Sequence, residues 1–479
     1  MSETPVDTFV EEHQTFRDEL ATIARDGRRR WIYARQPSGR LYRARTVVSV
    51  FLLAFLVLAP FVHFRGQPLV MLNVIERRFV LFGTMFWPQD FYLVVLIALG
   101  VLVTLALSTV TVGRVWCGWL CPQTIFMEML FRKLEFWLDG SAGQQLRRDH
   151  GPWDRGRIML AVRKHAIVFA LSFGLANVFL AWIIGKDDLW RIVTDPPRQH
   201  VGGLTAITIF SLVFYGVFAR FREQACVLAC PYGRVMSSLI DPHTITVTYD
   251  SVRGEPRGKR RKDAEAASAG VTGDCIDCFQ CVTICPTGID IRDGIQMECV
   301  NCTACIDACN DVMRRVDRPE GLIRLTSHEA MRSGTGGWLT ARVTAYGAVW
   351  LVLVAVVAAL LWTRRDLDVL VLRQPGTLYT TTLGGDLANF YTLQAFNRSN
   401  RPVRFSIDVV EPRGATVMPL GPLDQVGPHG LLEGRFLLRA PTSALTGAST
   451  PVRLAVRADG EPAGEVVSSF LGPASTVRP

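Results

Sequence analysis

Five long apolar runs stand out along this chain. They cover about 46–64, 91–113, 165–185, 203–219 and 342–362. A helix needs roughly 20 consecutive apolar residues to cross a bilayer core, and each run approaches or exceeds that length. One such run could be a buried helix of a soluble domain. Five together predict a multi-pass membrane protein in a lipid bilayer.

A different pattern follows the fifth run. Short segments between residues 366 and 479 alternate apolar and polar positions, with turn-forming residues at 397–400 and 411–414. The alternating segments lie at 391–396, 403–410, 433–439, 451–457 and 464–470. Several short strands at this spacing predict an immunoglobulin-like β-sandwich. No catalytic constellation is visible in it, so a docking or positioning role is expected.

The basic residues predict the orientation of the spans. Nine arginines precede the first run and eight basic residues lie between 132 and 164, whereas the other two loops of this region carry about three each. Cytoplasmic loops are enriched in Lys and Arg, so the N-terminus is expected in the cytoplasm. Five spans then place the C-terminal domain outside, although Arg364 and Arg365 weakly oppose this. The polar first 45 residues lead into a full-length span, and no cleavable signal peptide is apparent.

The net charge of +9 does not indicate a nucleic-acid partner. The run Arg257, Lys259, Arg260, Arg261 and Lys262 is the strongest basic cluster near the fourth and fifth spans. A cytoplasmic loop close to anionic lipid explains such a cluster better than nucleic acid does.

Eight of the 12 cysteines form two tandem C-x2-C-x2-C-x3-C runs. This is the spacing of a bacterial ferredoxin with two [4Fe–4S] clusters, in which the fourth cysteine of each run ligates the other cluster. The first cluster is therefore expected on Cys275, Cys278, Cys281 and Cys309, and the second on Cys299, Cys302, Cys305 and Cys285. A zinc site is the alternative, but zinc usually takes two separated pairs of ligands. Asn310 stands where the second run would normally carry a proline.

The remaining four cysteines form a second, repeated pattern. Cys117 and Cys121 precede Pro122, and Cys226 and Cys230 precede Pro231, each pair just after a span that enters the cytoplasm. Residues four apart share one face of a helix, so each motif can aim two sulfurs in one direction. Each proline discourages helical continuation, which places the thiols where helix gives way to loop.

Several roles fit these four thiols. Thiolates favour Cu(I), zinc or an iron–sulfur centre, and a dithiol pair could also cycle redox equivalents. Four buried cysteines acting as small hydrophobes are the plainest alternative. Glu128, seven residues beyond the first motif, could assist metal or proton transfer, but a solvated helix-end carboxylate is expected. His63 and His165 are expected to be interfacial.

With these motifs in view, the chain resembles the CcoG family of cytochrome c oxidase accessory proteins, also called FixG or RdxA. The resemblance covers nearly the whole chain and lies in WCGWLCPQ at 116–123, ACPYGR at 229–234, RGEPRG at 253–258, the doubled cluster motif and the segment at 378–402. The membrane cysteine motifs are shared with the wider NapH-like and NosR-like membrane ferredoxins.

The resemblance implies a cupric reductase that supplies Cu(I) for assembly of a cbb3-type oxidase. Cys117, Cys121, Cys226 and Cys230 would then be the copper site, and the ferredoxin cysteines the electron relay. The implied partners are oxidase subunits or copper chaperones and transporters, together with an unidentified electron donor. A homodimer remains open. The chain would lie in the bacterial inner membrane, with the ferredoxin domain cytoplasmic and the C-terminal domain periplasmic.

Two other functions compete with copper reduction. The chain could be an electron conduit between a quinol or cytosolic donor and another respiratory enzyme, or a scaffold whose tail holds the oxidase during assembly. The expected organisation is the same in each case. It consists of an N-terminal segment (1–45), a four-helix membrane region (46–240), a 2[4Fe–4S] ferredoxin domain of α+β type (241–335), a fifth membrane helix (336–365) and the immunoglobulin-like domain (366–479).

Overall fold

The computed structural model describes residues 21–473, except 24–25, 27, 65–66, 74–77, 87–89, 259–272, 335, 365–366, 377 and 383–384. Most of the basic run noted above, Lys259 to Lys262, therefore lies outside the described residues, as does Arg365. The chain divides into two compact units, 1–61 with 94–356 and 62–93 with 357–479.

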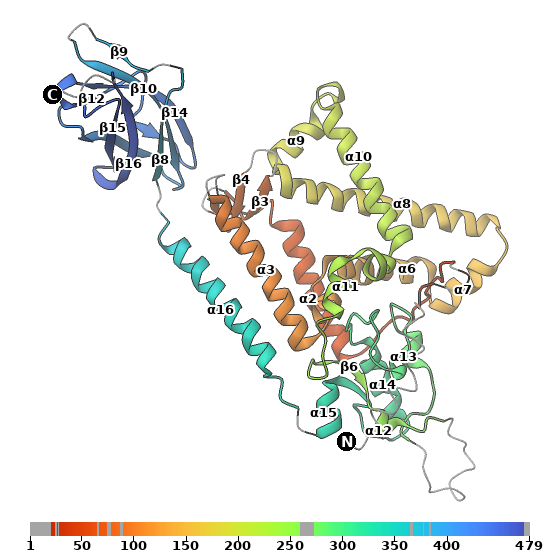
Figure 1. The fold of residues 1–479 in the computed structure, drawn as a ribbon. Coiled ribbons are helices and arrows are strands. Elements are labelled where there is room, and N and C mark those ends of the chain that lie inside the picture. The colour runs from red at the N-terminus through yellow and green to blue at the C-terminus, as the bar shows by residue number, and fades with distance from the viewer. Residues whose placement is uncertain are drawn as a thin grey trace, which may run out of the picture. The chain divides into compact units, whose positions relative to one another are not determined.

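Among the described residues, five helices are long and apolar enough to cross a membrane: α2 (Arg40–Leu58), α3 (Phe91–Val112), α8 (Arg155–Ile184), α10 with its π-helical extension η5 (Val201–Phe221), and α16 (Ala341–Trp362) (Figure 1). Between 6% and 28% of each apolar window is buried by the rest of the protein. The rest of each window is exposed apolar surface, which requires a lipid environment. The prediction of a multi-pass membrane protein is confirmed by these helices.

Two helix boundaries differ from the expected spans. Helix α2 begins at Arg40 and ends at Leu58, because Pro60 follows and a proline disfavours helix at the residue before it. The expected domain boundary at residue 46 therefore falls inside this helix. Helix α8 begins at Arg155, where the Asp154 carboxylate accepts a hydrogen bond from the Arg157 N–H and caps the helix. Its first ten residues include Arg155, Arg157, Arg163 and Lys164, and these four charges are why the apolar run alone did not reveal them.

Shorter helices follow the second and fourth spans. After α3 come α4 (Val115–Trp119), α5 (Pro122–Thr124), the π-helical segment η3 (Ile125–Phe131), α6 (Arg132–Asp139) and α7 (Ala142–His150). Helix α9 (Lys186–Thr194) and the 3₁₀ turn η4 (Pro197–Gln199) connect α8 to α10. The π-helical segment η6 (Ala225–Ala229) and α11 (Pro231–Ser237) follow η5. π-Helical segments are rare and are frequent at functional sites, and here they adjoin or contain both C-x3-C-P motifs.

The ferredoxin region folds around two cysteine-lined loops. Strands β6 (Thr246–Tyr249) and β7 (Ile323–Thr326) pair antiparallel, and α12 (Ser251–Gly254), α13 (Gln280–Thr283), η7 (Ile291–Asp293), α14 (Ala304–Arg315) and α15 (His328–Ser333) complete it. Its core contains Val247, Ile289, Met313 and Leu322 together with several cysteines. The Asp307 carboxylate on α14 accepts hydrogen bonds from the backbone N–H groups of Leu41 and Tyr42, which fixes this region at the start of α2. Asn310 lies inside α14, so the absence of a proline there lets the helix continue.

The second unit is a β-sandwich with the predicted strands. One sheet has the order β12-β14-β10-β8, with β9 beside β10, and the other has the order β13-β11-β15-β16. The strands are β8 (Leu367–Arg373), β9 (Thr380–Thr381), β10 (Leu387–Asn397), β11 (Val403–Glu411), β12 (Thr416–Pro419), β13 (Gln425–Val426), β14 (Leu431–Ala440), β15 (Ser449–Ala458) and β16 (Glu461–Leu471). Tyr391 and Phe436 stack in the core with ring centroids 5.3 Å apart. The immunoglobulin-like prediction is confirmed.

The sequence did not predict that residues 62–93 form part of this second unit. They contain two short strands, β1 (His63–Phe64) and β2 (Gln67–Pro68), and the sheet β3 (Val70–Asn73), β4 (Arg78–Leu81) and β5 (Thr84–Phe86). Val80 and Met85 pack against Phe396 of the sandwich. The buried Asp90 carboxylate pairs with Arg364 at 2.6 Å and with Arg398 at 2.8 Å. The loop between the first two spans is therefore joined to the C-terminal domain by packing and by charge.

Candidate redox centre

The two ferredoxin cysteine runs have the same backbone conformation. Asp277 and Phe279 in the first run, and Asn301 and Thr303 in the second, all have positive φ values, between 51° and 64°. The left-handed region is uncommon for residues other than glycine, so its use at matching positions is informative. It turns each loop tightly enough for three cysteines to face one space, after which α13 or α14 begins.

The structure brings the cysteines together in two sets. One cavity, called here the Cys275 cavity, is lined by Cys275, Cys278, Cys281 and Cys309. The other, called the Cys299 cavity, is lined by Cys285, Cys299, Cys302 and Cys305, with Cys281 at its edge. These are the two crossed ligand sets that the sequence predicts, so the residues present fit two [4Fe–4S] clusters.

The chemistry of the lining also fits metal centres. Burial raises the pKa of Cys302 to about 11 and that of Cys299 to about 12. Four such thiols would remain protonated without metal, whereas a coordinating metal deprotonates them. Among the described residues, no group of three or more His, Cys, Asp or Glu side chains is arranged to hold a single metal ion. A cubane distributes its four ligands over four irons, so its cysteines need not meet at one point.

The C-x3-C-P motifs are interrupted helices. Cys117 lies on α4, while Cys121 is extended (ψ 124°) and precedes Pro122 at the start of α5. Cys226 lies in η6, and Cys230 is likewise extended (ψ 111°) before Pro231 of α11. The helix therefore breaks at each proline, as expected, because the proline disfavours the helical conformation at the preceding cysteine. The two cysteines of a pair consequently do not share one face of an uninterrupted helix.

The four motif thiols, called here the thiol quartet, nevertheless lie near one another. Burial raises the pKa of Cys226 to about 12, and the charges of Cys121, Cys117 and Cys230 contribute in the same direction. Gln123 beside the first motif donates a hydrogen bond to the Arg222 carbonyl near the second, at 3.5 Å. The two hairpins thus pack together at the ends that carry the C-x3-C-P motifs, as the internal repeat suggested.

The first motif lies directly against the Cys299 cavity. A Cβ atom on Gly118 would lie 2.4 Å from the Val300 carbonyl oxygen and 3.0 Å from the Cys302 Cα. Only glycine allows two backbones to approach this closely. The Asn301 side-chain amide also reaches the Val112 carbonyl at 3.5 Å. The residue between Cys117 and Trp119 therefore contacts the loop that carries Cys302, and this contact is called here the junction.

A chain of buried ion pairs adjoins the junction. Lys164 pairs with Glu135 at 3.0 Å, Glu135 with Arg222 at 2.8 Å, and Arg132 with Glu128 at 3.1 Å. Glu223, which is 2% exposed, lies between the Arg222 and Arg132 guanidinium groups at 3.8 and 3.9 Å. Glu128 is 6% exposed, so the expectation of a solvated carboxylate is wrong. Buried charges in a membrane protein are costly and are usually functional.

Sequence reasoning missed several of these residues. From the sequence, Arg45 and Arg132 count only among the basic residues that set the orientation, and Gly118 only as part of a motif, with no role of its own predicted. Arg222 stands out only as the arginine before the second C-x3-C-P motif, as Arg114 does before the first. Arg222 follows the fourth span directly and is followed by Glu223, an acidic residue that could have signalled a buried pair. The histidines carry no site: His165 Nδ1 and the Tyr215 hydroxyl lie 2.8 Å apart, and His63 is exposed.

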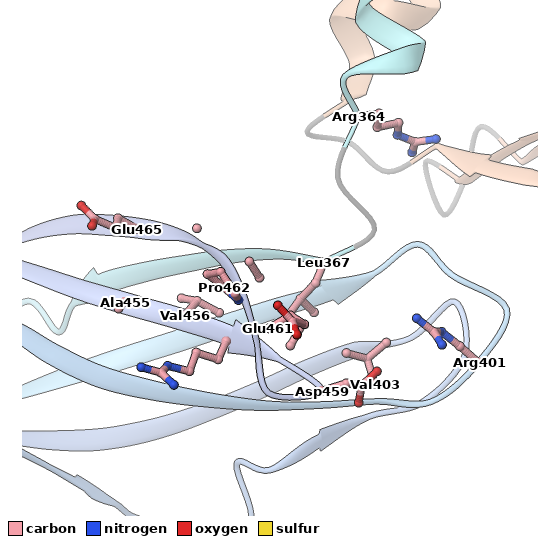
Figure 2. Close-up of a pocket in the computed structure, with 14 residues that line it drawn as sticks. Arg364, Leu367, Arg401, Val403, Ala455, Val456, Asp459, Glu461, Pro462 and Glu465 are labelled. Carbon is pink, nitrogen blue, oxygen red and sulfur yellow. The ribbon is translucent and has the colours of Figure 1, made fainter.

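The C-terminal unit contains a broad open groove. It is lined by Arg401, Asp459, Glu461 and Glu465 and by backbone of β15 and β16, with no cysteine or histidine among its described lining residues. Figure 2 shows Glu461 and Asp459 near the β15–β16 turn, with Glu465 further along β16.

Five spanning helices, two cysteine-lined cavities and a β-sandwich define a membrane-associated iron–sulfur redox protein. Family models agree: a 4Fe-4S dicluster domain matches residues 221–328, a 4Fe-4S binding domain matches 93–140, and the immunoglobulin-like fold at the C-terminus of FixG, a putative oxidoreductase, matches 357–473. The chain is 34% identical to protein RdxA of Cereibacter sphaeroides, over 91% of this chain and 96% of that protein. It belongs to the FixG/RdxA family.

Two further similarities complete the comparison. The chain is 35% identical to nitrogen fixation protein FixG of Rhizobium meliloti, over 62% of this chain and 57% of that protein. The crystal structure of a FixG-related protein from Vibrio parahaemolyticus matches 22% of this chain and 97% of that chain, at 23% identity and a TM-score of 0.20. That score is too low to support a structural argument.

Proposed function

We propose that this protein reduces Cu(II) to Cu(I) for the assembly of a cbb3-type haem–copper oxidase. Copper is its substrate, and the thiol quartet is where Cu(II) receives its electron. The single observation that carries the proposal is the junction, where Gly118 lies against the loop of Cys302. An electron acceptor held by Cys117 and its neighbours is then close to one of the two cluster cavities.

The properties of the quartet support a role in copper chemistry. Cu(I) is soft and prefers thiolates, so sulfur ligands stabilise the product of the reduction. Two [4Fe–4S] clusters, held by the crossed sets of ferredoxin cysteines, would supply one-electron reducing equivalents. Each Cu(II) takes up one electron to become Cu(I), and each quartet thiol that coordinates the copper releases its proton when the metal binds. The quartet sulfurs are near neighbours that do not converge on one point, so copper binding would draw them together.

The proposed topology places the ferredoxin region and the quartet on the cytoplasmic side. The concentration of basic residues before α2 and between α3 and α8 supports this orientation. The C-terminal domain would then be periplasmic, in the inner membrane of a bacterium. Oxidase subunits, or copper chaperones and transporters, are the proposed partners.

The test is an anaerobic single-turnover experiment. The purified protein is reduced until its cluster absorbance bleaches, Cu(II) is added, and absorbance recovery is followed together with Cu(I) captured by a chelator. Cys117→Ser/Cys121→Ser and Cys226→Ser/Cys230→Ser variants with full iron content are run beside the wild type. The proposal expects recovery matched by Cu(I) in the wild type and lost in both variants.

The opposite result has a clear meaning. Equal recovery in the quartet variants would show that Cu(II) merely oxidises exposed clusters. An electron conduit to another respiratory enzyme would then be the better account of the chain.

A further inference from the structure

Two buried arginines at the junction have N–H groups with no acceptor in the described part of the protein. Arg45 is 1% exposed and its Nη2 is unpartnered, and Arg114 is 4% exposed and its Nε is unpartnered. An unsatisfied buried donor is costly, and more so when it is charged. Native proteins rarely retain one unless something else accepts the hydrogen bond.

Arg45 belongs to α2 and reaches the junction. Its Nε donates to the Gly118 carbonyl at 2.7 Å. Because an added Cβ atom on Gly118 would lie 3.0 Å from the Cys302 Cα, the guanidinium lies near the loop that carries Cys302. The guanidinium therefore lies close to a cysteine of the second ligand set, with a donor to spare.

Arg114 also reaches the loop that carries the second cysteine run. It donates a hydrogen bond to the Met297 carbonyl, two residues before Cys299. A Cβ atom on Gly233 of α11 would lie 2.9 Å from its Nη2, so the second motif also packs on it. Arg114 thus lies between the Cys299 cavity and the thiol quartet.

The arginines beside the Cys275 cavity are different. Arg292 donates to Asp277 and to Asp290, both at 2.6 Å, and Arg253 donates to Asp274 at 2.5 Å. Their charges are therefore neutralised by carboxylates. Arg45 and Arg114 bond to backbone carbonyls instead, and no ion pair is recorded for either within the described residues. Glu128 lies near Cys302 but is already paired with Arg132.

We propose that Arg45 and Arg114 direct N–H groups and uncompensated positive charge at the sulfurs of the cluster held in the Cys299 cavity. Hydrogen bonds to sulfur and nearby positive charge raise the reduction potential of an iron–sulfur cluster. When the two clusters hold one electron between them, that electron then resides mainly on the cluster in the Cys299 cavity, which is the one beside the thiol quartet. The transfer oxidises one cluster, reduces the other and moves no proton. This inference rests on the iron–sulfur sites and not on copper as the substrate.

The experiment is a potentiometric titration of the full-length protein in detergent, followed by electron paramagnetic resonance. The wild type should reduce in two separate one-electron waves. In Arg45→Gln and Arg114→Gln, the higher wave should move down and the lower wave should stay. The equilibrium constant for electron transfer between the clusters should fall about tenfold or more for each substitution. Arg43→Gln is the matched control, because Arg43 is exposed on the same helix and should leave both waves unchanged.

Cluster content is measured in every variant as iron and acid-labile sulfide. Unchanged waves in both glutamine variants with intact clusters would overturn the inference, as would a shift confined to the lower wave. If the glutamine variants lose a cluster, the same titration is made on Arg45→Lys and Arg114→Lys, because lysine retains the positive charge that the inference invokes. Lysine variants with two intact clusters must keep the waves separate, and merged waves would overturn the inference. Because the readout contains no copper, failure here leaves the proposed copper reduction standing.

Discussion

The two cysteine cavities share a loop conformation but differ in what surrounds them. The Cys275 cavity includes an exposed cysteine, Cys278, beside Phe279, which is 46% exposed. None of the four cysteines that the sequence groups in the Cys299 cavity is exposed, and Gly118 of the first membrane motif lies against its loop. The same sequence motif therefore forms one cavity with an exposed cysteine, the Cys275 cavity, and one that lies against the first membrane motif, the Cys299 cavity. They are called below the outer and the inner cavity, and the clusters expected in them the outer and the inner cluster.

The crossed ligand sets give the largest expected effect. Cys285 belongs to the first run but lines the Cys299 cavity, and Cys309 belongs to the second run but lines the Cys275 cavity. Cys285→Ser should therefore abolish the inner cluster alone, and Cys309→Ser the outer cluster alone. Each variant should retain about half of the iron and labile sulfide, because a [4Fe–4S] cluster uses four cysteine ligands.

The spectra of the two serine variants provide the control for that prediction. Their remaining electron paramagnetic resonance signals should differ from each other and sum to the wild-type signal, apart from coupling between the clusters. If Cys285→Ser loses the cluster that Cys278→Ser also loses, each run binds its own cluster and the crossed assignment is wrong.

The two cavities also differ in the ion pairs near them, which are buried beside the Cys299 cavity and partly exposed beside the Cys275 cavity. Glu135→Gln should destabilise the protein by about 3–5 kcal/mol, because it removes the carboxylate that pairs with the buried Arg222 at 2.8 Å. Lys164 keeps its pair with Asp139 at 2.7 Å. Arg318→Gln is the comparison near the outer cavity, where Arg318 is 44% exposed and pairs with Asp274 at 3.1 Å. That surface pair should contribute about 0–1 kcal/mol. Thermal unfolding in detergent, with both variants at matched iron content, measures the difference.

The same carboxylate predicts a pH dependence. Burial opposes ionisation of Glu135, but Arg222, Lys164 and Arg132 outweigh it and hold its pKa below the usual 4.5. A depressed pKa stabilises the fold fully above the usual value, and this contribution is lost as the pH falls through the folded pKa. Wild type and Glu135→Gln should therefore differ most in melting temperature at neutral pH and converge below about pH 4. If the difference in melting temperature between wild type and Glu135→Gln grew as the pH fell, the lowered pKa of Glu135 would be contradicted.

A smaller effect is expected at the junction itself. Gly118→Ala places a methyl group where the Val300 carbonyl lies and pushes the first motif away from the inner cavity, with all 12 cysteines retained. Displacement by about 1 Å can cost up to about 100-fold in rate, so Cu(II)-dependent reoxidation should slow by about 10–100-fold. Gly174→Ala is the control, since nothing lies within 4 Å of its added Cβ. Unchanged reoxidation in Gly118→Ala would mean that electrons do not cross at this contact.

The cysteine spacing allowed the crossed ligand sets to be predicted because the ferredoxin loop fixes which side chains face one space. Hydropathy found the five helices because each is exposed to lipid over most of its length. The position of Gly118 could not be predicted, since it depends on how the ferredoxin region packs on helices far away in sequence. The burial of Arg45 and Glu128 was not predicted either, because the sequence around a single charged residue does not show whether tertiary packing will bury it.

The association of residues 62–93 with the β-sandwich was missed for a related reason. These residues form strands of two to four residues, too short for a clear alternating pattern. The contacts that place them, such as Asp90 with Arg398, join positions more than 300 residues apart in sequence. Local pattern carries no information about such pairs.

The most direct test of the account compares single-turnover copper reduction in the two single-cluster variants. Cys309→Ser, which should keep the inner cluster, is reduced anaerobically and mixed with Cu(II) and a Cu(I) chelator, beside Cys285→Ser, which should keep the outer one. The account predicts about one Cu(I) per protein, formed promptly, in Cys309→Ser and little in Cys285→Ser over the same time, because a [4Fe–4S] cluster transfers one electron. Equal rates in the two variants, or faster reduction in Cys285→Ser, would contradict the claim that electrons leave through the Cys299 cavity.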